Sequence, residues 1–381
     1  MANPFYLQEI PVDAPLCDRE KELKELRSYA EARVNVVLFS PRRFGKTSLV
    51  RRIQSLLAAK GAVVVFADFF GVGSVEDVAA RLAKAIYGFS HGKPSLWKKA
   101  LRTLLSFRPV LKPDPSGGIS LSVEPATAGR SGLDLLEETI ESLCHFIEDS
   151  KRLVHMALDE FQEIVTLKEA LKIEAILRTH IQRQKASYFF IGSRRRVLLG
   201  IFNERQRPFF QSAINYPLGP LPAADLGKFI TWQFKEHGKS CTEDMGLRLA
   251  SSVACHPYYS EKLGFFVYEM AEAVTEETIQ AALQKLIASE KPVFEAILQG
   301  LSPHQRLLLK ALALEPPKKI LAGSYIQRHA LGSTGGVQHS TKQLEDLDLI
   351  ERKGDPEQWQ LVDPVLAMWL ETTGYLAKSR K

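Results

Sequence analysis

An eight-residue segment near the N-terminus restricts the possible folds of this chain more than any other segment. Residues 40–47 have the sequence SPRRFGKT, which matches the phosphate-loop pattern G-x-x-x-x-G-K-[ST] except that Ser40 replaces the first glycine. The apolar, β-branched run 34–39 precedes it and predicts a strand that is buried on both faces. Residues 49–57 follow with apolar side chains at helical spacing. A strand, a phosphate loop and a helix in this order predict the start of a parallel α/β sheet.

The positions of this loop have distinct predicted roles. Gly45 allows backbone N–H groups to approach phosphate oxygens, Lys46 reaches the β- and γ-phosphates, and the Thr47 hydroxyl binds Mg²⁺. Ser40 can still form the turn, but it lacks the freedom of glycine at positive φ. The alternative is a chance G-K-[ST] after a strand. The predicted nucleotide contacts of the loop are Ser40, Pro41, Arg42, Arg43, Phe44, Gly45, Lys46, Thr47 and Ser48.

An acidic pair follows a second apolar run. Residues 153–158 predict a strand that ends in Asp159 and Glu160, which is the Walker B pattern. Asp159 is expected to hold Mg²⁺ together with Thr47, and Glu160 to polarise the attacking water as general base. The alternative is a helix N-cap followed by an acid in the first turn. With the loop, this pattern predicts ATP and Mg²⁺ as ligands.

Arginines cluster after a further predicted strand, residues 188–191. Ser193 or Arg194 can sense the γ-phosphate, because strand ends on this side of a parallel sheet line the ligand crevice. Arg205 and Arg207 are candidates for arginine fingers that reach a neighbouring subunit. The alternative for the run 194–196 is a cluster that faces solvent or DNA.

Strands and helices alternate as far as about Pro222, which predicts an α/β fold with a parallel sheet and helices on both faces. Residues 108–112 and 119–123 flank a turn at 113–118 and predict an inserted hairpin. The expected organisation is a P-loop NTPase core at 1–222 with an insertion at about 88–130, a helical lid at 223–300, and a winged helix at 301–381. Further predicted strands are 62–70 and 214–218, and further predicted helices are 20–32, 75–87, 133–148 and 167–184.

The charge of the 381-residue chain is unevenly distributed. The formal net charge is +6, but residues 178–210 carry +7 and residues 88–115 carry +5, which leaves −6 elsewhere. Basic segments of this kind allow an anionic partner such as DNA, or are simply solvated faces. No apolar stretch approaches the ~20 residues that span a bilayer. The four cysteines are scattered, and the first residues do not form a signal peptide, so a cytoplasmic protein without membrane contact is expected.

The C-terminal region has the order of a helix-turn-helix with a β-wing. Helices are predicted from Ser302, at 324–331 and at 337–347, and a wing at about 354–360. Val337, Leu344 and Leu347 are expected to face inward. Residues 301–381 carry a net charge of only +2, so both DNA and a protein remain possible partners. The candidates for the outer face of the third helix are Gln338, His339, Ser340, Lys342 and Gln343.

These motifs together resemble the archaeal-type ATPase family of the AAA+ and STAND-related P-loop NTPases. The resemblance implies ATP between the sheet domain and the lid, with Arg19 near the adenine and Pro257 covering the base from the lid side. Gln211 stands about where the family often has an arginine. The matching segments are 17–20, 42–49, 158–162 and 190–193, extended by 256–259, 347–352 and 361–370.

The expected function is a slow, Mg²⁺-dependent ATP hydrolase that acts as a nucleotide-controlled switch. Its expected partner is double-stranded DNA, bound through the basic insertion and the winged helix, and a homo-oligomer is possible. A STAND-like signalling scaffold, whose winged helix binds protein, is the alternative. A winged-helix regulator with a relic nucleotide fold is a third possibility, against which the intact Lys46, Thr47, Asp159 and Glu160 argue.

Overall fold

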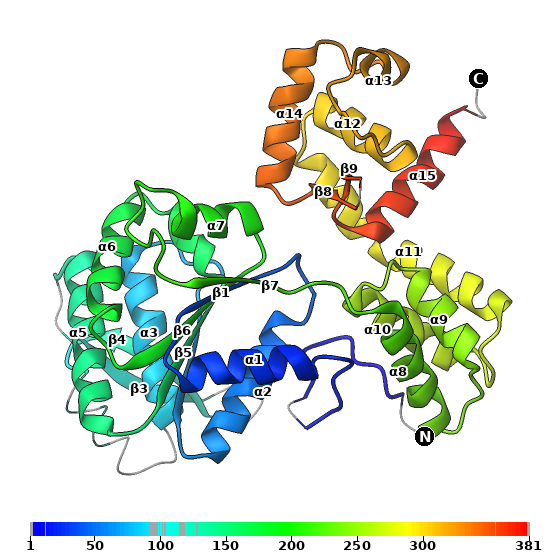
Figure 1. Cartoon of the computed structure of the whole chain (residues 1–381). Helices are drawn as coiled ribbons and strands as arrows, with labels where there is room; N and C mark the ends of the chain where they lie inside the picture. Colours follow the sequence, from blue (N-terminus) through cyan, green and yellow to red (C-terminus); the bar gives the residue numbers. More distant parts are fainter. Residues whose placement is uncertain are drawn as a thin grey trace. The chain divides into compact units, whose positions relative to one another are not determined.

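A computed structural model describes residues 3–11, 13–90, 98, 100, 102, 104–113, 119–126, 129–354 and 356–378. The chain divides into two compact units, coloured along the sequence in Figure 1. The sheet unit comprises Arg19–Ser40 and Lys46–Leu218. The helical unit comprises Met1–Asp18, Pro41–Gly45 and Gly219–Lys381. The chain therefore passes from one unit to the other four times.

A five-stranded parallel sheet forms the centre of the sheet unit (Figure 1). Of the three inner strands, β5 and β6 are buried along their whole length, as expected for strands covered on both faces. The predicted α/β fold is therefore confirmed. The spatial order is β2-β5-β6-β1-β7, with β1 Val36–Phe39, β2 Val63–Asp68, β5 Val154–Asp159, β6 Ala186–Gly192 and β7 Ile214–Pro217.

Helices cover both faces of the sheet. On one face, Leu26 of α1 and Val50 of α2 share a hydrophobic cluster with Leu38 of β1. On the other face, α3, α5 and α6 pack in a larger cluster that contains Val65 of β2 and Met156 of β5. The helices of this unit are α1 Glu20–Glu31, α2 Lys46–Ala59, α3 Val75–Ser90, α5 Gly132–Ser150, the 3₁₀ turn η1 Phe161–Thr166, α6 Ala170–Ile181 and α7 Arg195–Asn203.

The register of the strands brings three motif segments to one edge of the sheet. Leu38 pairs with Ile191, and Leu158 pairs with Phe190. Because all strands run in the same direction, the residues that follow β1, β5 and β6 emerge side by side at their carboxyl ends. This is the edge at which open α/β sheets bind ligands.

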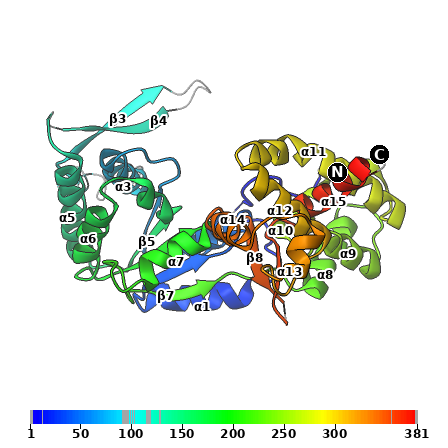
Figure 2. The ribbon, with the colours of Figure 1, turned by 90° about the horizontal axis from the view of Figure 1, so that it is seen from above.

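The insertion forms an antiparallel hairpin, as expected, from β3 (Phe107–Pro113) and β4 (Ile119–Pro125). Figure 2 shows it as a separate ribbon beyond α3. The hydroxyl of Tyr87 on α3 is hydrogen-bonded to the carbonyl oxygens of Leu104 and Phe107, both at 2.9 Å, which anchors the base of the hairpin. Residues 114–118 of the predicted turn lie outside the described residues.

The helical unit is built around one hydrophobic cluster that runs through both the predicted lid and the predicted winged helix. The chain divides into compact units between Leu218 and Gly219, but residues 223–300 and 301–381 lie in the same unit. The predicted boundary between the lid and the winged helix therefore stays a prediction. The elements are α8 Ala223–Glu236, α9 Glu243–Ser251, α10 Pro257–Met270, α11 Glu276–Gln299, α12 Pro303–Leu314, α13 Gly323–Arg328, α14 Thr334–Asp346, β8 Ile350–Lys353, β9 Gln358–Leu361 and α15 Pro364–Lys378.

An N-terminal arm, residues 3–6, belongs to this helical unit. Phe5 is buried, and its ring lies 5.0 Å from that of Phe234 in α8. Asn3 donates to Phe265 O at 3.2 Å, and Tyr6 N donates to the Glu261 carboxylate at 3.0 Å. The arm is therefore held by both packing and hydrogen bonds to α8 and α10.

Two expectations for the winged-helix region are wrong. Ser340 of α14 does not face outward: it is buried, with its Oγ 2.7 Å from Nδ1 of His304. A small hydroxyl can be buried once an internal partner satisfies it, and periodicity does not reveal that partner. Leu347 is half exposed because α14 ends at Asp346, before that side chain reaches the core. The other outer-face candidates, Gln338, His339, Lys342 and Gln343, are exposed as expected.

Candidate nucleotide-binding site

The phosphate loop joins the end of β1 to the start of α2. Gly45 has φ +82° and Arg43 has φ +62°, so the sharp turn is made in the second half of the loop. Ser40 is not among the residues with positive φ, and it therefore needs no glycine-like freedom. This explains how the loop tolerates serine at its first position.

Lys46 is the first residue of α2 and is buried at 6% exposure. Its Nζ donates to the carbonyl oxygen of Ser40 at 3.0 Å and lies 3.2 Å from Ser40 Oγ. The Lys46 side chain thus links the end of the loop to its first residue, Ser40. A buried cation at a helix N-terminus forms a site where an anionic phosphate is favoured.

Thr47 and Asp159 meet across the same edge of the sheet. Thr47 Oγ1 donates to Asp159 Oδ2 at 2.8 Å, although the residues are 112 positions apart in the sequence. Burial raises the pKa of Asp159, and the bond from Thr47 opposes that rise. A buried carboxylate beside a hydroxyl provides two of the oxygen ligands that Mg²⁺ prefers, and phosphate oxygens complete such sites. These two residues therefore fit a magnesium–nucleotide complex.

Within the described ranges, no three or more His, Cys, Asp or Glu side chains gather into a metal site made by protein alone.

Glu160 follows Asp159 in a left-handed conformation, with φ 49°. This turn directs its carboxylate to Ser193, which follows β6 and donates from Oγ at 3.2 and 3.1 Å to the two carboxylate oxygens. Ser193 is buried, so the hydroxyl is fixed rather than solvated. The structure thus brings the predicted general base and the predicted γ-phosphate sensor into contact.

Gln162 is a site residue that the motifs did not identify. Its amide Nε2 donates to the Glu160 carboxylate, and its side chain is fully buried. A Cβ atom at Gly192 would overlap the Gln162 amide, so glycine is required there to leave room for it. The glycine at the end of β6 is the sequence signal that accompanies this contact.

The predicted arginines are engaged in ion pairs inside the sheet unit. Arg194, at the start of α7, lies 3.7 Å from the carboxylate of Glu163 in η1. Arg207 pairs with Glu174 of α6, whose side chain is completely buried. A finger role for Arg207 would require this pair to open, and both arginine roles stay predictions. Arg205 is exposed.

Two loop residues also contact other parts of the helical unit, to which residues 41–45 belong. The Arg43 guanidinium lies 4.1 Å from the centroid of the Tyr258 ring and 3.8 Å from Glu290 Oε1 of α11. The Phe44 and His256 rings are 4.7 Å apart, edge to face. These side chains are therefore occupied by contacts with the residues that begin α10.

The remaining predicted contacts have the following positions. Arg19 is buried before α1 and donates to Glu22 at 2.6 Å, and Pro257 is the first residue of α10. Their roles at the adenine stay predictions. Pro41 is buried, Arg42 is exposed and Ser48 is half-buried in α2.

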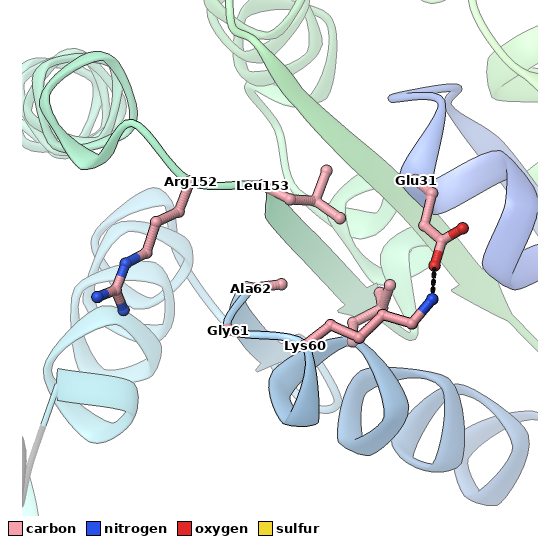
Figure 3. Close-up of a pocket in the computed structure, with 7 residues that line it drawn as sticks. Glu31, Lys60, Gly61, Ala62, Arg152 and Leu153 are labelled. Atoms are coloured by element: carbon pink, nitrogen blue, oxygen red, sulfur yellow. Dashed lines mark hydrogen bonds and ion pairs between the residues drawn. The ribbon is translucent and has the colours of Figure 1, made fainter.

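A small hollow at the opposite edge of the sheet lies apart from these groups. It has a volume of about 210 Å³ and lies where β2 and β5 begin. Figure 3 shows its ion pair between Glu31 and Lys60, at 2.8 Å, with Arg152 at the rim. Since the motif residues follow the carboxyl ends of the strands, this hollow is not part of the nucleotide site.

A phosphate loop between a buried strand and a helix, with an acidic pair at the end of a neighbouring parallel strand, defines a P-loop NTPase. Residues 16–192 match the model of an ATPase domain found predominantly in Archaea, and residues 292–372 match that of a probable winged helix domain. Residues 16–192 are therefore an ATPase domain of the archaeal type, as the motifs implied, and a winged helix domain follows it.

Solved structures agree with this fold. A Walker-type ATPase of Pyrococcus abyssi superposes with a TM-score of 0.69 at 17% identity, covering 96% of this chain and 99% of that one. The ORC2 protein of Aeropyrum pernix, solved in ADPNP–ADP complexes, gives 0.58 at 16% identity, with 98% of both chains covered. The ORC1 protein of Aeropyrum pernix in complex with DNA gives 0.53 at 14% identity, covering 98% and 97%. At these identities the likeness concerns the fold.

No curated protein matches the sequence. In the described part of the chain, every helix is too short or too polar to cross a membrane.

Proposed function

We propose that this protein binds ATP with Mg²⁺, hydrolyses it slowly, and changes its affinity for DNA according to the bound nucleotide. The observation that carries the proposal is one edge of the sheet where a buried lysine, a hydroxyl–carboxylate pair and an oriented glutamate lie together. These groups are Lys46, Thr47 with Asp159, and Glu160 with Ser193. The ADPNP–ADP complexes of the ORC2 neighbour support a nucleotide in such a fold.

The chemistry follows from the positions of these side chains. Lys46 and the backbone amides of the loop bind the β- and γ-phosphates. A bound Mg²⁺ supplies neutralising charge on the phosphate oxygens, and Thr47 and Asp159 are the residues that would hold it. Glu160 accepts a proton from the attacking water as its oxygen bonds to the γ-phosphorus, while ADP leaves with the bridging oxygen. Ser193 keeps the Glu160 carboxylate oriented for that transfer.

A paired substitution tests hydrolysis. Lys46→Ala is expected to lose ATP binding, because the cation that pairs with the phosphates is gone. Glu160→Gln is expected to keep ATP binding and to lower turnover about 100-fold or more, since an amide accepts no proton. Binding is measured by titration with a fluorescent ATP analogue, and turnover by phosphate release. Equal turnover in the wild type and Glu160→Gln would remove Glu160 from the base role.

Two regions support a role on DNA. Lys98, Arg102, Arg108 and Lys112 of the insertion have exposed side chains, although Lys112 also pairs with Glu124 at 3.3 Å. In the winged helix, α14 presents exposed polar and basic side chains, among them Lys342. Such groups suit phosphate and base-edge contacts. The ORC1 neighbour was solved in complex with DNA.

Coupling between ATP and DNA is tested by measuring duplex affinity at several salt concentrations, with ATP, with ADP and without nucleotide. Direct phosphate contacts give a steep fall of affinity with salt. A nucleotide switch further requires that the affinity differ between the ATP and ADP forms. Identical affinities in all nucleotide states would exclude a DNA switch.

The second candidate is a signalling scaffold whose winged helix binds a protein. Leu314 and Leu347 favour it, because both are about half exposed in the nearly neutral winged-helix region. In this case DNA affinity would be weak at physiological salt and indifferent to ATP.

A further inference from the structure

Among the described strands, none pairs with the outer side of β2, the strand at one lateral edge of the central sheet. β2 comes first in the spatial order, where it pairs with β5. Val63 N donates to Leu153 O at 2.8 Å, and Phe69 N donates to Asp159 O at 3.0 Å, so the odd-numbered residues face β5. In a parallel ladder the alternate residues face the other way. The N–H and C=O groups of Val64 and Phe66 therefore point away from the sheet.

A groove of about 860 Å³ lies along this edge. Its size is within the range of ordinary ligand sites, ~300–1,000 Å³. Val64 and Phe66 of β2 line one side, α3 lines another, and Val123 of hairpin strand β4 also contributes. The apolar part of the lining consists of Val64, Phe66, Ala67, Ala80, Ala85, Phe89 and Val123.

Cations surround this apolar lining. Arg51 of α2 lies over the Phe66 ring, 3.6 Å from its centroid, and Lys84 of α3 is exposed at the rim. Arg81 donates to the carbonyl oxygens of Asp68 and Phe70 at 3.0 and 3.1 Å, which closes the edge after Phe66. The accessible edge is thus short and has basic side chains beside it.

The carboxylates of the groove accept hydrogen bonds from nearby main chain. Asp68 Oδ1 accepts from Phe70 N at 2.8 Å, and Asp77 Oδ2 accepts from Gly73 N at 3.0 Å. The lining nevertheless carries three basic side chains, Arg51, Arg81 and Lys84, against these two carboxylates, so its formal net charge is +1. The lining therefore favours an occupant with apolar and acidic side chains.

We propose that this groove binds an extended, acidic segment of a partner protein, which adds as a strand to β2. Main-chain groups of the segment would pair with Val64 and Phe66, as in strand addition to other exposed sheet edges. Alternate side chains would then rest on the apolar lining and reach Lys84 and Arg51. This site uses none of the residues of the nucleotide site, although Val123 of its lining belongs to the insertion that we propose to bind DNA.

The charge requirement is tested with the full chain and a fluorescein-labelled peptide of four Val-Glu repeats. We expect saturable binding by anisotropy, no binding of the Val-Lys counterpart, and at least tenfold weaker binding by Lys84→Glu. Lys172→Glu, an equal charge reversal at an exposed site of α6, is the matched control and should bind as the wild type does. Equal binding by Lys84→Glu and Lys172→Glu would overturn the proposal.

The strand geometry has its own test. Val64→Pro removes an N–H that points away from the sheet, which edge strands tolerate, and is expected to weaken peptide binding at least tenfold. Val64→Thr keeps the donor and should bind normally. Hydrogen exchange of the Val64 and Phe66 amides should slow when the peptide binds, whereas the Val65 amide, which faces β5, should change little. Unchanged exchange at both positions under saturation excludes strand addition.

A nucleic acid is the competing occupant for a basic rim. A 16-nucleotide DNA strand is therefore added to the peptide complex. If it displaces the peptide and its own affinity depends on Lys84, the groove is a nucleic-acid site and the proposal is wrong. Retention of the peptide supports it.

Discussion

Glu160 shows how the fold orients the side chain that we propose as the general base. Its left-handed backbone turns the carboxylate from β5 toward the residue that follows β6, where Ser193 and Gln162 both donate to it. A general base must lie within hydrogen-bond reach of the water that it deprotonates. Two fixed donors restrict the carboxylate to one orientation, so we assign Ser193 and Gln162 as positioning residues for the proposed reaction.

Ser193→Ala is expected to reduce kcat about tenfold while leaving ATP affinity unchanged. Hydrogen bonds to charged groups contribute ~1.5–3 kcal/mol, and ~1.4 kcal/mol corresponds to a tenfold change in rate. The measurement is steady-state phosphate release together with ATP titration. Ser187→Ala is the control, because Ser187 is an equally buried hydroxyl of β6 that bonds His155 instead. If both variants lose turnover equally, the effect is one of packing.

At this scale the sequence predicts well the residues whose backbone spacing is part of a motif. The loop pattern gave Lys46 and Thr47, and the strand-end pattern gave Asp159, which the structure brings into contact with Thr47. The role of Gln162 was not predicted, because its contact with Glu160 depends on the left-handed turn at Glu160, which the periodicity of the sequence does not reveal. Ser40 looked like a departure only because the motif does not show which loop positions have positive φ.

Among the elements, α6 and the 204–211 segment after α7 are joined by a buried charge pair. Glu174 lies inside α6 with no exposed surface, and Arg207 reaches it from the segment. Burial raises the pKa of Glu174 to about 7, although Arg207 opposes the rise. The folded protein therefore binds a proton at Glu174 more tightly than the unfolded chain does.

This difference predicts a pH dependence of stability. The contribution of Glu174 to the free energy of unfolding is fully present below its ordinary pKa of 4.5 and is lost as pH rises through about 7. Glu174→Gln lacks this titration. We expect the stability of the wild type relative to Glu174→Gln to fall between pH 5 and pH 8, as measured by urea denaturation. A relative stability that rises with pH would show that Arg207 dominates the titration.

The elements themselves were largely predictable. Strands β5 and β6 coincide with predicted apolar runs, because strands buried on both faces leave an uninterrupted hydrophobic signal, whereas β7 is mostly exposed. Helix α7 was not predicted, because the arginines of its first turn were interpreted as a charge cluster that follows a strand. The third helix of the winged-helix region begins at Thr334, inside a predicted glycine turn, because Ser333 caps it there.

On the scale of the whole molecule, the N-terminal arm extends the core of the helical unit. Phe5 fills a space beside Gly264 of α10, where a Cβ atom would come within 2.6 Å of its ring. Asn3 and Phe265 are joined by a bond across 262 positions of sequence. Local patterning cannot predict such a contact, because the residues that surround Phe5 lie more than two hundred positions away.

Phe5→Ala is expected to destabilise the helical unit by about 3–5 kcal/mol, the usual cost of removing a buried phenylalanine side chain. Tyr6→Ala, at a neighbouring residue whose side chain is 38% exposed, should cost far less. Guanidinium unfolding followed by tryptophan fluorescence measures both, because Trp232 and Trp369 belong to this unit. Similar losses in the two variants would contradict an anchoring role for Phe5.

The helical unit contains segments from before and after the sheet unit in the sequence, and this has a consequence for folding during synthesis. Ribosomal synthesis is vectorial, so residues 3–6 emerge before the sheet unit, while α8 and α10, which bind them, emerge after it. The sheet unit can form as soon as residue 218 is released, with the arm still unattached. Formation of the helical unit then requires the N-terminal arm to bind α8 and α10. A fragment that begins after Phe5 would lack most of the N-terminal arm, so its helical unit would fold without the contacts that Asn3 and Phe5 provide.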